Sequence, residues 1–342
     1  TYYNTQTRDG IVTAVLPPST GFGFETRNAV SMRNIGLELQ GNVRVFQSRD
    51  WQIDLGGNYA FNRNRVQSLG DPAVQTLGVG SSFGGRTTNA VVGEQLGVIR
   101  GTDFARCRFG EATNTVGGVD INAACRAAGA PDGALYIGAN GFPVADPTER
   151  TIGDPNPNYF AGVRTGVTFR RLSFNTFWDI RNGGTIQNMT KASMYNYGTH
   201  RDTEIRGSTV TFGQDYRLGG VGPAQFPVVG PGAGRAVTIG EGWFAGTGGI
   251  GGPVAPFQES ASFVRLREIS VGMNLNQPWV SRRLGLSSVD LRLTGNNIAL
   301  WTDYTGFDPE TSLSGGAVIT QGFDWFNAPN ARRFVLSVGL NR

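Results

Sequence analysis

Apolar and polar residues alternate with a period of two along seven segments of the chain. In the first segment Ile35, Leu37 and Leu39 fall on one face, and Glu38 and Arg44 fall on the other. Successive side chains of a β-strand point to opposite faces, whereas a helix would scatter these apolar residues around its axis. The pattern therefore predicts strands at 35–45, 51–62, 159–170, 172–181, 268–276, 289–294 and 334–341.

Short and long connections alternate between the predicted strands. The short connections are 47–51, 170–172 and 278–287, and the long ones are 66–154, 182–259 and 301–331. The strands reach about 10 to 15 residues, whereas about 5 to 6 is common in globular proteins. We therefore predict an all-β fold, a transmembrane antiparallel β-barrel with short periplasmic turns and long extracellular loops. The loops are expected to hide further barrel strands in even number, with 96–109 as a candidate.

The two faces of the predicted strands differ in polarity. Charged and amide side chains occupy mid-strand positions on one face, which suits a polar lumen. The residues expected to face the lumen are Glu38, Arg44, Gln52, Asp54, Asn58, Arg164, Asp179, Arg181, Asp290 and Arg292. The row expected to face lipid includes Trp51, Ile53, Leu55, Tyr59 and Phe61. Aromatic residues stand near the ends of such rows, where interfacial girdles of membrane barrels lie.

Composition agrees with a barrel and disfavours several other classes. The chain has 342 residues, of which 39% are hydrophobic and 51 are glycine. No run of about 18 apolar residues occurs, so no transmembrane helix is predicted. The formal net charge is +4, and Lys191 is the only lysine. Because the arginines are dispersed among acidic residues rather than gathered into a patch, nucleic-acid binding is not expected.

The sequence offers little chemistry beyond one pair of cysteines. Cys107 and Cys125 lie in a long loop, and they would form a disulfide in an oxidising compartment or remain two free thiols. The single histidine, His200, has no partner pattern for a metal or a triad. The glycine runs match no phosphate-binding motif. We therefore expect no metal, no cofactor and no catalytic site, and the acidic residues Glu149, Asp154, Asp179 and Asp202 form no recognisable pair.

Aromatic residues cluster in the two later loops. They could stack on a ligand or pack on a partner protein, and they could equally close the loops on themselves. The candidates for ligand or partner contact are Tyr195, Tyr197, Trp243, Phe244, Trp325 and Phe326.

Several short motifs are more specific than the alternation. Residues 262–270 read SFVRLREIS, residues 291–297 read LRLTGNN, and residues 301–310 fit the pattern W-x-x-Y-x-G-x-D-P-E. Earlier in the chain, residues 16–22 read LPPSTGF, residues 31–36 read SMRNIG and residues 152–157 read IGDPNP. In this order the motifs resemble those of SusC/RagA-type TonB-dependent transporters.

That resemblance implies a fold and a role. The family has 22 antiparallel strands around an N-terminal plug, takes up oligosaccharides or peptides with energy from TonB, and often works beneath a SusD-type lipoprotein. No plug, TonB-contacting segment or first half of the barrel is found in residues 1–342, so we expect a partial barrel domain from the C-terminal part. The acidic loop that many members carry is replaced by residues 138–141, GANG, and no cation site is carried over.

The sequence raises three candidate functions. The first is a TonB-dependent outer-membrane uptake receptor for a bulky nutrient such as an oligosaccharide or a peptide. The second is a structural or surface barrel of the outer membrane, whose loops bind neighbouring proteins. The third, a soluble carbohydrate-binding β-protein, agrees with the loop aromatics but not with the strand lengths.

Overall fold

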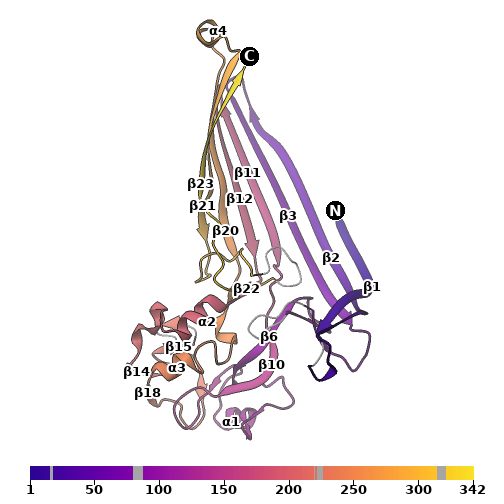
Figure 1. Cartoon of the computed structure of the whole chain (residues 1–342), viewed down its shortest axis with the longest axis vertical. Coiled ribbons are helices and arrows are strands. Elements are labelled where there is room, and N and C mark those ends of the chain that lie inside the picture. The colour runs from indigo at the N-terminus through magenta and orange to yellow at the C-terminus, as the bar shows by residue number, and fades with distance from the viewer. Residues whose placement is uncertain (16–17, 80–87, 219, 222–225, 314–320) are drawn as a thin grey trace.

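A computed structural model describes residues 1–15, 18–79, 88–218, 220–221, 226–313 and 321–342. Long strands form one tall antiparallel sheet, and the long connections gather below it as a folded loop domain (Figure 1). The sheet contains, in spatial order, β1 (Tyr2–Val15), β2 (Phe24–Gln47), β3 (Trp51–Ser68), β11 (Tyr159–Phe169), β12 (Leu172–Asn182), β20 (Phe263–Leu275), β21 (Ser288–Trp301) and β23 (Arg333–Asn341).

All seven strands predicted from alternation belong to this sheet, so that prediction is confirmed. The structure adds β1, whose polar sequence does not alternate and which pairs along most of its length with β2. Strand β2 is 24 residues long and extends well beyond the predicted 35–45. The backbone ladder therefore continues into segments in which side-chain polarity gives no signal.

The expected barrel strand at 96–109 is wrong. Strand β6 (Val98–Phe104) pairs with β10 (Ala145–Gly153) and β5 (Thr88–Val91), and β4 (Thr76–Gly78) completes this separate sheet. Both faces of β6 carry buried residues, so its apolar content reflects packing inside the loop domain. In the described residues β3 pairs directly with β11, and no barrel strand lies between them.

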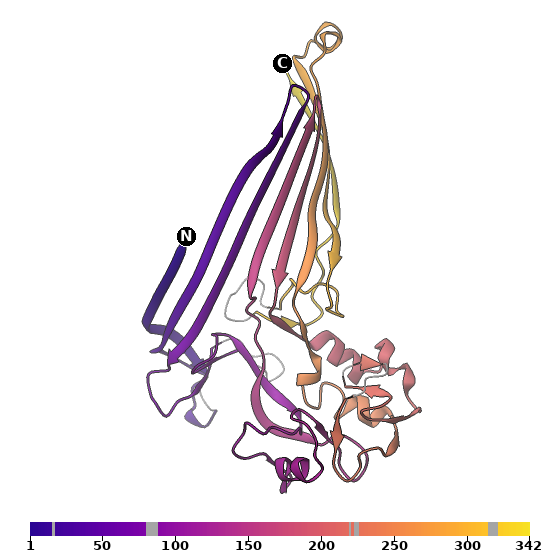
Figure 2. The ribbon, with the colours of Figure 1, turned by 180° about the vertical axis from the view of Figure 1, so that it is seen from behind.

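The remaining elements belong to the loop domain, except α4, which lies in a short turn at the other end of the sheet (Figure 2). The helices are η1 (Pro18–Thr20), α1 (Ile121–Ala127), α2 (Met189–Asn196), η2 (Arg201–Ile205), α3 (Glu241–Ala245), η3 (Ala255–Phe257) and α4 (Pro278–Leu284). The short strands are β7 (Thr115–Val116), β8 (Val119–Asp120), β9 (Leu135–Tyr136), β13 (Thr185–Asn188), β14 (Thr209–Thr211), β15 (Tyr216–Arg217), β16 (Gly220–Val221), β17 (Val228–Val229), β18 (Ala236–Thr238), β19 (Gln258–Ser260) and β22 (Phe323–Asp324). No described helix is long and apolar enough to cross a membrane.

Most of the hydrophobic core lies in the loop domain, and a smaller cluster includes Val30 and Val66 at the loop end of the sheet. The largest cluster packs Phe104, Tyr195, Phe212, Trp243 and Phe257, all nearly inaccessible to solvent. The apolar face of the sheet is open by contrast, and Leu336 of β23 is 70% exposed. An apolar face of this extent needs a non-aqueous covering. The loops thus fold on their own core, while the sheet is held by its backbone ladder and keeps an exposed apolar face.

Candidate functional site

The strand register separates the two faces of the sheet cleanly. Trp51, Phe169, Leu172, Met273 and Leu291 stand opposite one another across five neighbouring strands, with Val338 completing the row on the sixth. The residues that alternate with this apolar row point to the other face of the sheet and are mostly polar. The pairing register places all ten residues that were predicted to face a lumen on this polar face.

The polar face carries side chains that bond to one another both across strands and along one strand. Arg44 Nε donates to Asp54 Oδ1 at 3.0 Å, and Gln52 Nε2 donates to Asp54 Oδ2 at 2.5 Å. The guanidinium of Arg164 lies 4.7 Å from the centre of the Phe177 ring. A groove of about 680 Å³ is lined by Arg44, Asp54, Arg164 and Phe177 and also reaches Glu268 and Arg292. The groove offers cations, amides and two carboxylates along one open surface, which suits reversible contact with a polar solute.

Aromatic pairs mark both ends of the apolar face. At the turn end the rings of Trp51 and Phe169 lie 4.4 Å apart, and at the loop end Trp178 stacks on Trp301 at 5.7 Å. Tyr159 and Phe169 are the first and last residues of the 11-residue strand β11, and at about 3.3 Å per step they lie about 33 Å apart. Tilted by about 40°, such a strand covers about 25 Å, the height of the apolar band of a membrane barrel.

An ion-pair cluster at the loop end of the sheet joins two motifs that are distant in sequence. Arg265 of the SFVRLREIS run and Asp308 of the D-P-E run pair at 2.5 Å, and both side chains are almost fully buried. Arg267 bonds to Asp179 at 2.6 Å and also pairs with Glu310. Sequence reasoning placed Asp179 on this face but missed the other four residues. The recurrence of Arg in one motif and of acids in the other was the available signal.

Asp308 is the most completely satisfied member of this cluster. Burial alone would raise the pKa of its carboxyl. Hydrogen bonds from Arg265 and from the backbone N–H groups of Glu310 and Asn330 outweigh burial and lower that pKa below its ordinary value. The carboxyl is therefore held ionised, as a buried ion pair requires.

Contacts in the structure explain the residue type at several positions of the W-x-x-Y-x-G-x-D-P-E motif. Tyr304 donates its hydroxyl hydrogen to Asp324 at 2.5 Å, and burial together with Asp324 raises the pKa of that hydroxyl. A Cβ at Gly306 would lie only 2.4 Å from the Tyr304 ring, so only glycine fits there. Trp301 belongs to the aromatic pair at the loop end. The motif thus fixes the path of the loop that brings Asp308 to Arg265.

The only lysine of the chain links three segments of the loop region. Lys191, at the start of α2, is buried and lies 3.3 Å from Glu259 and 3.2 Å from the hydroxyl of Thr305. Glu259 also accepts from the backbone N–H of Thr305 at 2.7 Å. These contacts connect the loop between β12 and β20 to the loop between β21 and β23.

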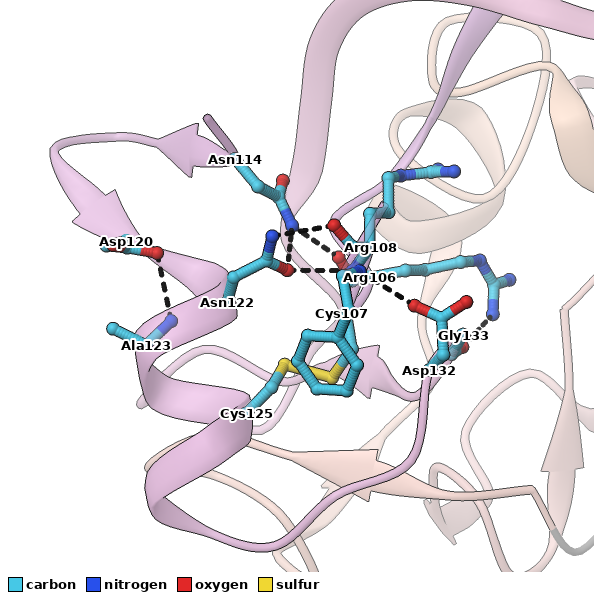
Figure 3. Close-up of a disulfide and its surroundings, with 11 residues drawn as sticks. Arg106, Cys107, Arg108, Asn114, Asp120, Asn122, Ala123, Cys125, Asp132 and Gly133 are labelled. Carbon is cyan, nitrogen blue, oxygen red and sulfur yellow. Dashed lines mark hydrogen bonds between the residues drawn. A yellow bond between two sulfur atoms is a disulfide. The ribbon is translucent and has the colours of Figure 1, made fainter. Parts of the chain in front are cut away.

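Cys107 and Cys125 form a buried disulfide that anchors α1 to the strand region before it (Figure 3). Asp120 caps the helix by accepting from the N–H of Ala123 at 2.9 Å. Asn122 accepts from the N–H of Arg108 at 2.7 Å and donates to its carbonyl at 2.6 Å. The disulfide therefore belongs to a small subdomain of the first long loop that hydrogen bonds also hold together.

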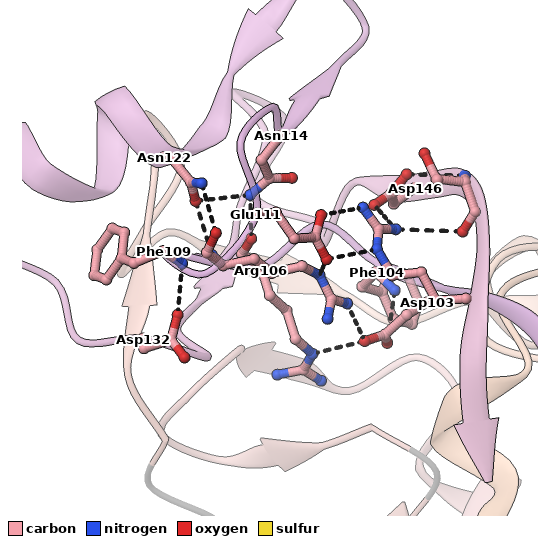
Figure 4. Close-up of polar contacts among 12 residues, drawn as sticks. Asp103, Phe104, Arg106, Phe109, Glu111, Asn114, Asn122, Asp132 and Asp146 are labelled. Atoms are coloured by element: carbon pink, nitrogen blue, oxygen red, sulfur yellow. Dashed lines mark hydrogen bonds and ion pairs between the residues drawn. The ribbon is translucent and has the colours of Figure 1, made fainter. Parts of the chain in front are cut away.

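Charged side chains join this subdomain to the sheet formed by β6 and β10 (Figure 4). Arg150 bonds to Glu111 at 2.9 Å and to Asp146 at 2.6 Å, and Asp103 bonds to both Arg106 and Arg108. Burial would raise the pKa of Asp146, but hydrogen bonds from Thr148 and Arg150 lower it overall. These acids therefore stabilise the loop domain through their ion pairs.

Three of the six loop aromatic residues expected to contact a ligand or a partner are buried instead. Tyr195, Trp243 and Phe244 are buried in the loop core and cannot contact a ligand or partner. Trp243 donates to the hydroxyl of Tyr216 at 3.2 Å, and burial raises the pKa of that hydroxyl to about 12. Tyr195 donates to Asp202. Apolar clusters in long loops predict contact sites when the loops are taken as open. These loops instead fold around a hydrophobic core of their own.

The other three aromatic candidates remain accessible to different degrees. Tyr197 is 75% exposed and Phe326 is 56% exposed, whereas Trp325 is half-buried beside it. Within the described residues no group of three or more His, Cys, Asp and Glu side chains could hold a metal ion. His200 accepts from the N–H of Asp202 at 3.1 Å and so completes a loop turn.

These features together define a class of protein. The sheet is antiparallel, apolar on one face and polar on the other, with aromatic pairs at both ends of the apolar face. Short turns lie at one end and large folded loops at the other (Figure 1). This is the architecture of part of an outer-membrane β-barrel.

Comparison with known proteins narrows the class. No model of a known protein family matches the chain. Two proteins named TonB-dependent receptors, both from Formosa agariphila, are each 24% identical to it over 99% of its length. The chain spans about a third of the length of these relatives, 31% of one and 32% of the other. A third receptor of that organism is 31% identical over 85 residues, which are 25% of this chain and 8% of the receptor.

Solved structures agree with the sequence relatives. A structure of the RagAB peptide transporter is similar over 99% of this chain and 32% of that chain, with a TM-score of 0.62 and 18% identity. A structure of the RagAB peptide importer in the closed-closed state is similar over 99% of this chain and 33% of that chain, with a TM-score of 0.60 and 17% sequence identity. The fold is therefore that of part of a TonB-dependent receptor barrel, and the predicted resemblance to the SusC/RagA type is confirmed.

Proposed function

We propose that the chain is the C-terminal part of the barrel of a TonB-dependent outer-membrane receptor that takes up a bulky nutrient, a peptide or an oligosaccharide. The observation that carries this proposal is its likeness, over 99% of its length, to a peptide transporter and to curated TonB-dependent receptors. The polar face then lines the lumen, and the apolar face meets lipid. The chain contributes a shaped wall and no bond-making chemistry, so we propose that it is not an enzyme.

The partners follow from the same proposal. Energy reaches the barrel through a plug and a TonB-contacting segment of the kind that such receptors carry. A SusD-like lipoprotein covers the loop end, where Tyr197 and Phe326 are exposed. The wall of the groove binds the solute through Arg44, Asp54 and Arg164. These contacts are individually weak and exposed, which suits passage better than tight retention.

Uptake in living cells tests the proposal. Cells that lack the full-length receptor are expected to lose import of one size class of peptides or oligosaccharides, and complementation restores it only in the presence of TonB. An Arg164→Ala variant should import more slowly at normal receptor abundance, whereas Arg332→Ala, outside the groove, should not. Normal import in the deletion strain would contradict the proposal.

The competing function is a surface barrel whose loops bind neighbouring proteins, and the exposure of Tyr197 and Phe326 is what favours it. The same deletion strain separates the two functions. Loss of an envelope complex with unchanged nutrient uptake would support the surface role. Loss of uptake with the envelope complexes intact would support the transporter.

A further inference from the structure

The short turns of the sheet gather positive charge at one end of the molecule. They contain five arginines, Arg49, Arg170, Arg171, Arg282 and Arg283, and a single acid, Asp50. Asp50 pairs with Arg170 at 3.1 Å. In the described part of the chain the other four arginines form no ion pair. A cationic surface without acidic partners is complementary to an anionic one.

Helix α4 adds an apolar component beside these charges. It lies in the turn between β20 and β21 and projects at the tip of the sheet, next to the ends of the other turns (Figure 1). Val280 is fully buried and fixes the helix, while Trp279 and Leu284 are 46% and 54% exposed. Gly285, with a φ of +66°, ends the helix. One short helix therefore presents an indole, a leucine and two guanidinium groups together.

This combination matches a membrane interface better than bulk water. Tryptophan prefers the headgroup level of a bilayer. Arginine binds phosphate through two parallel hydrogen bonds and keeps its charge there. The surface is also continuous with the apolar band, because Trp51 and Phe169 end that band at the same turns.

We propose that α4 and the turn arginines lie in the headgroup layer of the inner leaflet and bind phospholipid phosphates, with a preference for anionic lipids. The inference rests on the proposed outer-membrane barrel, because that barrel places the short turns at the inner leaflet. The interaction anchors the barrel at a fixed depth and accounts for the excess of arginine over acid at this end.

The position of the helix is tested with a fluorophore on Ser281→Cys in the full-length receptor, reconstituted in phosphatidylcholine nanodiscs with and without phosphatidylglycerol. A nitroxide on the lipid headgroup is expected to quench this label more strongly than aqueous iodide does. A label on Leu336→Cys, at the apolar face, serves as the reference and should be quenched by a nitroxide on the acyl chain. Cys107 and Cys125 are bonded to each other as a disulfide and do not react with the label.

The outcomes distinguish this inference from the function on which it rests. Quenching of the Leu336 label by acyl nitroxide, together with quenching of the Ser281 label by iodide alone, would leave the barrel standing. It would show that α4 projects into the periplasm towards another partner, and the inference would be overturned. Failure of acyl nitroxide to quench the Leu336 label would overturn the barrel itself.

The lipid preference is tested by charge removal. Arg282→Gln combined with Arg283→Gln should reduce retention of phosphatidylglycerol in native mass spectra by about five-fold per arginine. The matched control replaces Arg332 and Arg333, an exposed pair at the loop end of β23, by glutamine. Equal retention by the two double variants would contradict the assignment of lipid binding to α4.

Discussion

At the scale of single residues, the contact between Arg265 and Asp308 is the one whose loss should cost most. Asp308→Asn removes the closer of the two acids paired with the buried Arg265 and leaves only Glu310, at 3.5 Å. Breaking a buried ion pair typically lowers the free energy of unfolding by about 3–5 kcal/mol. We expect the folded, heat-modifiable form of the receptor to melt at a markedly lower temperature on electrophoresis. Asp303→Asn, two residues after the motif tryptophan and exposed, is the control and should change little. Equal melting of both variants would show that the pair is not structurally important.

The same pair predicts a pH dependence with a defined sign. The pKa of Asp308 lies below its ordinary value of 3.8 in the folded protein. Its ionised form therefore contributes stability that is fully present above this ordinary pKa and is lost as pH falls through the lower folded-state pKa. Melting temperatures of the native receptor and of Asp308→Asn should differ most at neutral pH and converge in acid. A difference that grows as pH falls would reverse the sign and contradict this explanation.

The sequence allowed the motifs to be recognised but not their pairing. Alternation placed Asp179 on the polar face, because a period of two assigns faces without reference to any partner. The contact of Arg265 with Asp308 spans 43 residues and depends on the path of the intervening turn and loop. Tyr304 and Gly306 belong to the motif, but the bond that fixes the path joins Tyr304 to Asp324, 20 residues further on, and no local pattern encodes it.

At the scale of elements, the disulfide should stabilise its subdomain and not the sheet. Cys107 and Cys125 are 18 residues apart, and a loop of this size corresponds to about 3 kcal/mol of stabilisation. The variant with serine at both positions should be cut by protease between these residues much faster than the native receptor. Its sheet should still resist denaturation by detergent at room temperature. Loss of both properties together would mean that the loop domain and the sheet fold as one unit.

Polarity patterns predicted elements well only where one face meets lipid. The apolar row of each barrel strand is dictated by the membrane, so seven of the eight strands of the sheet were found from alternation. Strand β1 was not predicted, because its described side chains are mostly polar and do not alternate. Backbone pairing with β2 defines this strand. In the loop domain apolar residues serve a compact core, so β6 resembled a barrel strand and Trp243 resembled a contact residue.

At the scale of the whole molecule, the sheet has two edge strands, β1 and β23, which pair on one side only in the described chain. Unpaired edges are avoided in stable β-proteins, and a barrel removes them by closure. Within a closed barrel the two faces of this sheet must meet different media. Adjacent residues of one strand therefore report on the inside and the outside of the barrel.

Leu39 and Gln40 of β2 provide such a pair, because both are exposed and they pair with Tyr59 and Asn58 on opposite faces. Cysteine at each position of the full-length receptor is labelled with the same fluorophore in nanodiscs that contain acyl-chain nitroxide. We expect strong quenching at position 39 and little at position 40, since only the first side chain points to lipid. Similar quenching at both positions would indicate an open or misfolded sheet. The reverse order would show that the lumen and lipid faces have been exchanged, which would remove the basis for a polar transport path along Arg44, Asp54 and Arg164.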